Sequence, residues 1–192
     1  MSGLVVEVQN HTRYTIKETA VETLAAAVLA AEGLTAGELG VTFVGEQRMR
    51  TLNRDYREVD RATDVLAFPL EEADELSAPP AEAGRAATPP AEADTADVPP
   101  ADAGEGGATL AVVTGGQEPP RLLGDVVVCP RVAQRQARAH GLPLTLEVAV
   151  LLVHGILHVL GHDHGTGAGA MAARQAELLQ GLDWESLGVA PR

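Results

Sequence analysis

The sequence predicts an α+β fold in which a small mixed β-sheet packs with helices around one central, buried helix. Two observations carry this prediction. Short runs rich in β-branched residues alternate with segments of helical periodicity, and the run 144–160 is almost entirely apolar. A length of 192 residues suits one domain, so we expect a single domain over 1–192.

The predicted elements lie on both sides of a central low-complexity segment. Alternating or β-branched runs predict the strands, and apolar positions three or four apart predict the helices. Gly33 suits the end of the first helix, and Pro130 suits the first turn of a later one. The predicted strands are Leu4–Val8, Leu39–Val44, Asp64–Phe68 and Gly124–Cys129. The predicted helices are Ile16–Ala31, Gly45–Tyr56, Pro130–His140, 144–160 and 170–182.

The segment at about 71–120 differs in composition from the rest of the chain. It holds 11 acidic residues, one basic residue and eight of the twelve prolines, mostly as Pro-Pro pairs ten residues apart. Proline removes backbone donors and like charges repel, so the segment cannot offset the entropy cost of ordering. We expect a disordered insertion, either a tolerated surface insertion or a docking tail for a basic partner. Within it, the more apolar Ala108–Thr114 could pair as an edge strand.

Charge and composition limit the classes of function. The net charge of −13 would disfavour a nucleic-acid partner, but −10 of it belongs to residues 71–120. Aromatic residues make up only 3%, which disfavours a protein that binds RNA mainly by stacking bases on aromatic side chains. The N-terminus lacks the features of a secretory signal, no apolar run is a good membrane span, and Cys129 is the single cysteine. We therefore expect a cytoplasmic protein with no membrane segment and no internal disulfide.

The segment from His154 to His164 contains four of the six histidines, at the spacing of a metal site. His154 and His158 are four residues apart in the apolar helix, so both rings face the same side. Gly161 tolerates a positive φ and can end the helix, which lets His164 turn back as the third ligand. Three imidazoles leave an open position for water, as in catalytic zinc sites. The alternative is that these histidines are ordinary surface or core residues.

Two further residues of this segment have open roles. We expect His162 to face the cleft or solvent, and the alternative is that it replaces His164 as the third ligand. Asp163 is expected either to orient a ligand imidazole or to support the turn. The spacing H-x-x-x-H-x-x-G-x-x-H is that of metzincin proteases, so we expect a zincin-like arrangement. Those proteases carry a general-base Glu where this chain has Gly155, which disfavours a peptidase that uses such a base.

Arginines along two predicted helices suit phosphate binding. Guanidinium groups make two-pronged contacts to phosphate, and a spacing of three or four residues places several on one helix face. The alternative is a solvated face with local ion pairs to Asp55, Glu58 and Asp60. The first stripe is Arg50, Arg54, Arg57 and Arg61, on one face if the helix extends that far, and the second is Arg131, Arg135 and Arg138. All of these except Arg57, whose role is considered below, are candidate RNA-binding residues.

Three segments carry a family resemblance. Residues 52–69 read L-N-R-D-Y-R-E-V-D-R-A-T-D-V-L-A-F-P, residues 124–129 read G-D-V-V-V-C, and H-G-I-L-H-V-L-G-H-D-H begins at His154. Together they closely resemble the YbeY family of bacterial ribosomal-RNA-processing endoribonucleases, over everything except the insertion. Two departures matter: Ala62 stands where the family usually has Pro, and the insertion separates two matching strands.

The resemblance implies a single-strand-specific, metal-dependent endoribonuclease that matures the 3′ end of 16S ribosomal RNA in the small ribosomal subunit and serves ribosome quality control. It implies one Zn²⁺ held by His154, His158 and His164, and a catalytic role for Arg57. Whether activated water or the RNA 2′-hydroxyl attacks is left open, as is the choice among Zn²⁺, Mn²⁺ and Ni²⁺. The alternatives are a metallopeptidase whose base comes from elsewhere and a non-catalytic ribosome-assembly factor with a structural metal.

Overall fold

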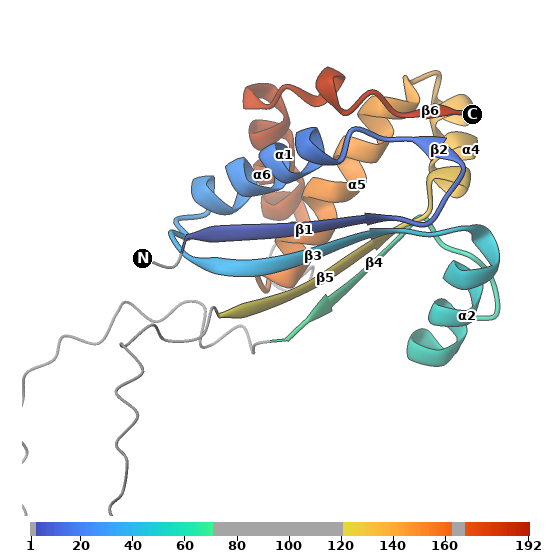
Figure 1. Cartoon of the computed structure of the whole chain (residues 1–192), viewed down its shortest axis with the longest axis horizontal. Helices are drawn as coiled ribbons and strands as arrows, with labels where there is room; N and C mark the ends of the chain where they lie inside the picture. Colours follow the sequence, from blue (N-terminus) through green and yellow to red (C-terminus); the bar gives the residue numbers. More distant parts are fainter. Residues whose placement is uncertain (1–2, 71–120, 163–167) are drawn as a thin grey trace, which may run out of the picture.

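The computed structural model describes residues 3–70, 121–162 and 168–192 (Figure 1). Its strands are β1 (Leu4–Asn10), β2 (Tyr14–Thr15), β3 (Gly37–Phe43), β4 (Val65–Pro69), β5 (Leu122–Val128) and β6 (Ala190–Pro191). Its helices are α1 (Glu18–Ala31), α2 (Glu46–Arg57), α4 (Pro130–His140), α5 (Leu144–Val159), α6 (Ala168–Gly181) and the short 3-10 helix η1 (Trp184–Leu187). The predicted insertion, with its candidate strand at Ala108–Thr114, lies outside the described residues.

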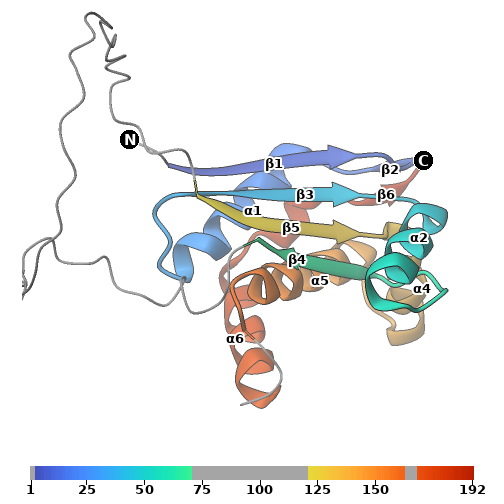
Figure 2. The ribbon, with the colours of Figure 1, turned by 90° about the horizontal axis from the view of Figure 1, so that it is seen from below.

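A four-stranded mixed sheet organises these elements. Its strand order is β1-β3-β5-β4, in which β1, β3 and β5 are parallel and β4 runs antiparallel to β5. The helices α1, α5 and α6 lie on one side of the sheet, and α2 lies on the other side at one end (Figures 1 and 2). The pair β2 and β6 forms a separate small sheet near the C-terminus. This architecture confirms the predicted α+β fold with a small mixed sheet.

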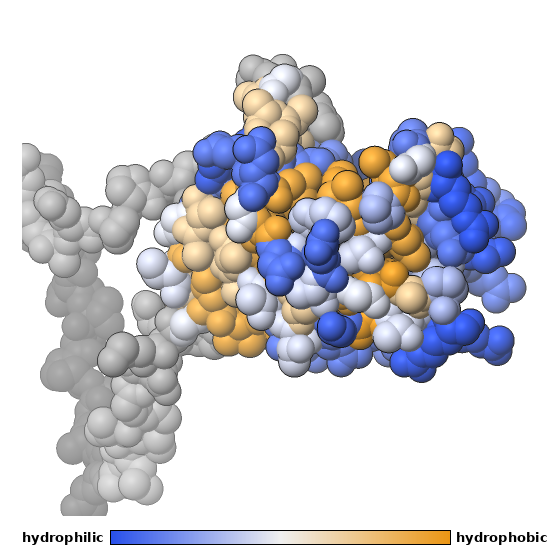
Figure 3. Space-filling view, turned by 90° about the horizontal axis from the view of Figure 1, so that it is seen from above, coloured by the Kyte–Doolittle hydropathy of each residue, from blue (hydrophilic) through white to orange (hydrophobic). Residues whose placement is uncertain are grey.

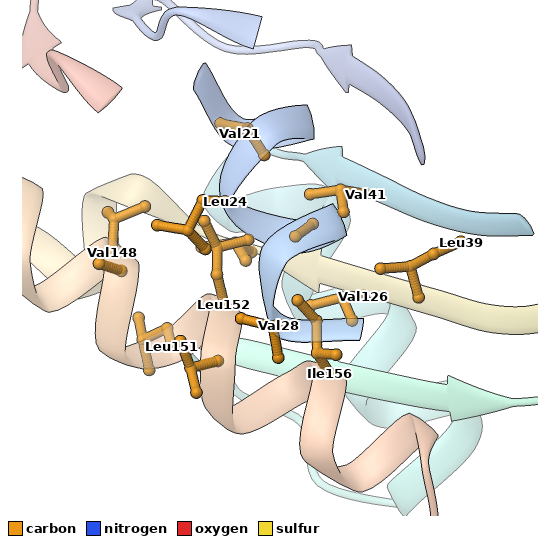
Figure 4. Close-up of a cluster of buried hydrophobic side chains, with 14 of the residues drawn as sticks. Val21, Leu24, Val28, Leu39, Val41, Val126, Val148, Leu151, Leu152 and Ile156 are labelled. Carbon is orange, nitrogen blue, oxygen red and sulfur yellow. The ribbon is translucent and has the colours of Figure 1, made fainter. Parts of the chain in front are cut away.

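The helix α5 is the predicted central helix, and it is buried around most of its circumference. Leu152 and Ile156 belong to the same core cluster as Val28 of α1 and Val126 of β5, and Figure 4 shows these side chains together. All four are fully buried. Burying each such side chain stabilises the fold by about 1.5–3 kcal/mol, so the core fixes α5 firmly against the sheet.

One glycine allows α5 to approach the sheet closely. A Cβ built on Gly155 would lie 2.6 Å from Cγ1 of Val126 on β5 and 3.3 Å from Cγ2 of Val65 on β4. A side chain at this position would require the Val126 side chain or the helix to shift. The close contact between helix and sheet thus disfavours the glutamate that metzincin proteases carry here.

We expect Gly155→Ala to destabilise the protein. Overpacking costs about 1–3 kcal/mol, and a 2.6 Å contact with a stiff β-branched side chain belongs in the upper part of that range, above the roughly 1 kcal/mol that alanine gains over glycine inside a helix. The melting temperature should fall by a few degrees, since 1 kcal/mol corresponds to about 2–4 °C in a chain of this size. Gly181→Ala is the control, because a Cβ there meets nothing within 4 Å. An unchanged melting temperature for Gly155→Ala would contradict the tight contact.

The boundaries of the predicted elements agree with the structure to within two residues. The sequence pattern does not predict β2, β6 and η1, because each has at most four residues and is too short to show a periodicity. Among the described residues, no single helix is long and apolar enough to cross a membrane. The helices α4 and α5 pass that test only as a pair, by length and composition, across a bend of 116°.

Candidate functional site

A cavity of about 590 Å³ lies between α5, β4 and the loop that precedes β4. His154 and His158 line it from α5, and Arg57 lines it from the C-terminal end of α2. Thr63 and Asp64 of the loop complete this part of the wall. The fold thus places one predicted catalytic arginine and two predicted metal ligands around one cavity, although they are far apart in the sequence.

The two histidines stand one turn apart with their rings close together. Their ring centroids are 4.6 Å apart and their planes cross at 80°, an arrangement that lets one nitrogen of each ring approach a shared ion. Oε1 of Gln175 on α6 lies 3.1 Å from Nδ1 of His154. When Nδ1–H donates to this oxygen, Nε2 keeps its lone pair for a ligand.

These donors fit a zinc ion, since paired imidazoles beside an open cavity are typical of zinc sites. Gly161, with a φ of 81°, follows α5 as predicted and turns the chain. His164, the third predicted ligand, and Asp163 lie outside the described residues. Within the described ranges 3–70, 121–162 and 168–192, no three His, Cys, Asp or Glu side chains are grouped for a metal ion.

His162 is partly exposed and contacts an acidic side chain. Its Nε2 lies 2.9 Å from Oε2 of Glu32, directly after α1, and it does not line the cavity. The other oxygen of Glu32 accepts a hydrogen bond from Nε of Arg174 on α6, at 2.8 Å. The contact therefore ties the segment that follows α5 to α1 and α6, a role that the spacing of the histidines does not reveal.

The helix α2 carries the first three arginines of the first stripe. It ends at Arg57, one residue beyond the predicted end, because Glu58 adopts a left-handed conformation, with a φ of 58°. Arg61 lies beyond the helix, so the condition for one extended face of four arginines is not met. Arg57 itself lines the cavity from the last turn of α2.

Most of the other candidate arginines form exposed ion pairs. These contacts agree with the alternative interpretation, in which the arginines lie on a solvated helix face. Each exposed pair contributes only about 0–1 kcal/mol to the stability of the fold. Figure 3 shows hydrophilic residues gathered at the end of the molecule where α4 lies. RNA binding by these residues, and by Arg61 and Arg138, stays a prediction. The pairs are Arg50 with Asp60, Arg54 with Asp55, and Arg131 and Arg135 with Glu46.

Asp64 is a residue of the cavity wall that sequence analysis did not identify as functional. Its Oδ1 accepts hydrogen bonds from the Thr63 hydroxyl at 2.8 Å and the Val65 N–H at 2.9 Å. Its Oδ2 accepts one from Gln136 at 2.9 Å. Burial raises the pKa of this carboxyl, but the hydrogen bonds outweigh burial and hold the pKa below its usual value. An ionised carboxylate with both oxygens in use fixes the loop and is poorly placed to act as a base.

Comparisons with known proteins identify the family of this chain. A family model described as Endoribonuclease YbeY matches residues 6–183. Endoribonuclease YbeY of Geobacillus kaustophilus (strain HTA426) is 36% identical over 162 residues, which cover 83% of this chain and 82% of that protein. Endoribonuclease YbeY of Moorella thermoacetica (strain ATCC 39073 / JCM 9320) is 37% identical over 159 residues, which cover 81% and 80%.

A solved structure supports the fold. The solution structure of TM1509 from Thermotoga maritima superposes with a TM-score of 0.55 at 20% identity, and the match covers 95% of this chain and 93% of that one. At this identity the match shows the architecture alone. With the family model spanning nearly the whole chain and relatives above one third identity, the chain belongs to the endoribonuclease YbeY family.

Proposed function

We propose that the protein is a metal-dependent endoribonuclease that cleaves single-stranded RNA in the cavity between α5 and β4. Family membership supports an enzyme that cleaves phosphodiester bonds within an RNA chain. The observation that carries the proposal is that Arg57 lines the same cavity as His154 and His158. Guanidinium suits a phosphodiester, and paired imidazoles suit a metal ion, so the cavity combines the two chemistries that the reaction needs.

We assign one Zn²⁺ to His154, His158 and His164. When bound, the ion supplies Lewis-acid polarisation of a phosphoryl oxygen and activation of water. The guanidinium of Arg57 binds the phosphate and stabilises the charge that develops on it in the transition state. Gln175 holds the ring of His154 in one orientation, at the 3.1 Å contact described above.

The substrate in the cell is proposed to be the 3′ end of 16S ribosomal RNA in the small ribosomal subunit, which places the protein in the cytoplasm and in ribosome quality control. Support for this finer assignment comes from the sequence motifs shared with the family. It is tested by comparing the cleavage sites on precursor and mature 16S RNA. Cleavage at random single-stranded positions, with none at the 3′ end, would contradict it.

A single preparation distinguishes this function from the alternatives. End-labelled single-stranded RNA, the same sequence as a duplex, and casein are incubated separately with the protein. We expect cleavage of the single strand but not of the duplex, as the resemblance to the family implies. We expect no degradation of casein, because Gly155 stands where a metzincin protease carries its general base. Degradation of casein without RNA cleavage would favour a metallopeptidase. Bound metal without either activity would favour an assembly factor.

We expect Gln175→Ala to weaken zinc binding about 10–100-fold, the usual effect of removing a partner that orients a ligand imidazole. Gln175→Glu should retain most of the affinity, because its carboxylate also accepts the bond from Nδ1–H of His154. Gln180→Ala, an exposed glutamine on the same helix, is the control. Zinc affinity is measured by competition with a chromophoric chelator. Equal affinity in Gln175→Ala and Gln180→Ala would contradict the role of Gln175.

A further inference from the structure

A second cavity, of about 850 Å³, is lined by residues of α2 and of the neighbouring strands. The helix α2 lies on the side of the sheet opposite α1 (Figure 2). We call the cavity the α2 groove. Arg48, Leu52 and Tyr56 line it from α2, and since they are four residues apart they share one face of that helix. Its floor includes Thr42 of β3 and Val127 of β5. Apart from Pro69, its lining residues differ from those of the cavity that holds the two histidines.

Two aromatic rings meet at one end of the α2 groove. Tyr56 is 67% exposed, and its ring packs edge-to-face against Phe68, with centroids 4.8 Å apart. Phe68 therefore supports the Tyr56 ring and leaves much of its surface open to a ligand. The scarcity of aromatic residues disfavours an RNA-binding protein with many stacking platforms, but one platform needs only this pair.

The α2 groove and the proposed active site are neighbours. Tyr56 and Arg57 follow one another in the last turn of α2, and Tyr56 lines the α2 groove while Arg57 lines the cavity of the histidines. Pro69 of β4 lines both. An RNA strand whose phosphate contacts Arg57 would therefore pass Pro69 and bring an adjacent nucleotide to Tyr56.

The polar lining of the α2 groove favours a nucleobase over an apolar segment of a protein. Arg48 supplies donors and Asp125 supplies acceptors around the apolar floor, and Nε2 of His11 lies 3.2 Å from Oε1 of Gln9 at its rim. A base offers a flat face for stacking and an edge with both donors and acceptors, whereas an apolar segment would cover the charged groups of Arg48 and Asp125 without offering them a hydrogen bond. The Asp125 carboxylate also disfavours a phosphate at this place.

We infer that the α2 groove binds a nucleobase of the single-stranded RNA substrate, stacked on Tyr56, next to the phosphate held by Arg57. This inference rests on the proposed function, which it extends by a binding subsite for the substrate. The subsite would hold the RNA on one side of the scissile bond. It should therefore contribute to affinity even when no cleavage occurs.

The test is RNA binding by the full-length protein in the presence of a chelator, measured by fluorescence anisotropy with a short labelled single strand. Tyr56→Ala should bind about 10-fold more weakly, within the range known for loss of one base–aromatic stack. Tyr56→Phe should bind like the wild type, because the ring remains. Leu142→Ala, an exposed apolar residue outside the α2 groove, is the control. Melting temperatures establish that each variant is folded.

A series of RNAs, each with one abasic position, identifies the contact directly. The wild type should lose about 10-fold in affinity at one position, and Tyr56→Ala should be insensitive to the same change, because its stack is already absent. If the wild type binds and cleaves RNA but Tyr56→Ala binds equally well, the inference fails while the proposed function stands, and a protein partner becomes the better occupant. If the wild type neither binds nor cleaves RNA, both fail.

Discussion

His158→Ala is expected to lose both stoichiometric metal and all RNA cleavage. His158 and His154 present their rings from one face of α5, with centroids 4.6 Å apart, so neither has an obvious substitute on that helix. Removing one of three ligands leaves two imidazoles, too few for a stable zinc site. Elemental analysis of the purified variant measures the metal, and end-labelled single-stranded RNA measures the activity.

His162→Ala is the matched control, four residues further along the chain. Because His162 contacts Glu32 and does not line the cavity, the variant should retain its metal. It should lose some stability, since the segment after α5 is then held less firmly to α1 and α6. Full metal occupancy in His158→Ala, or loss of metal in His162→Ala, would reject the assignment of the ligands.

Arg57→Ala is expected to keep its metal and its fold but to cleave RNA about 10²–10³-fold more slowly, the size typical of one preorganised charge donor. Arg57 cannot be a metal ligand, because guanidinium stays protonated and offers no lone pair. Arg57→Lys should recover only part of the rate, because a point charge replaces a two-pronged donor. Melting temperature, zinc content and cleavage rate are measured on the same samples.

A purely structural role for Arg57 predicts a different result, with stability and activity falling together. The structure argues against it, because other residues already hold the turn that follows α2. Asn53 donates a hydrogen bond to the Arg61 carbonyl at 2.8 Å, and Arg50 pairs with Asp60. Arg57 takes part in neither contact.

The control for this comparison is Arg54→Ala, an exposed arginine of the same helix that pairs with Asp55. Its removal should change the cleavage rate far less than removal of Arg57, because Arg54 does not line the cavity. Near-normal cleavage by Arg57→Ala would exclude the catalytic role.

Features with a local signal in the sequence were predicted well. The spacing of His154 and His158 fixes their common face on a helix, and the apolar run around them predicts a buried helix. Gly161 was expected to turn the chain, and it has the positive φ that this requires. The presence of Arg57 in the same cavity was expected only from the family motif, because no periodicity connects α2 with α5.

Features that depend on contacts between distant elements were not predicted. The pairing of His162 with Glu32 joins residues 130 positions apart, and the α2 groove forms only when α2 packs over the sheet. Asp64 was visible within the shared motif, but its role as an anchor depends on Gln136 of α4.

The most direct test of the central claim is cleavage of one end-labelled single-stranded RNA by the purified protein, before chelation, after chelation and after return of zinc, with metal content measured at each step. The account predicts about one metal ion per chain and cleavage at the start, loss of both after chelation, and recovery of both with added Zn²⁺. RNA cleavage that continues at full rate in metal-free protein would contradict it.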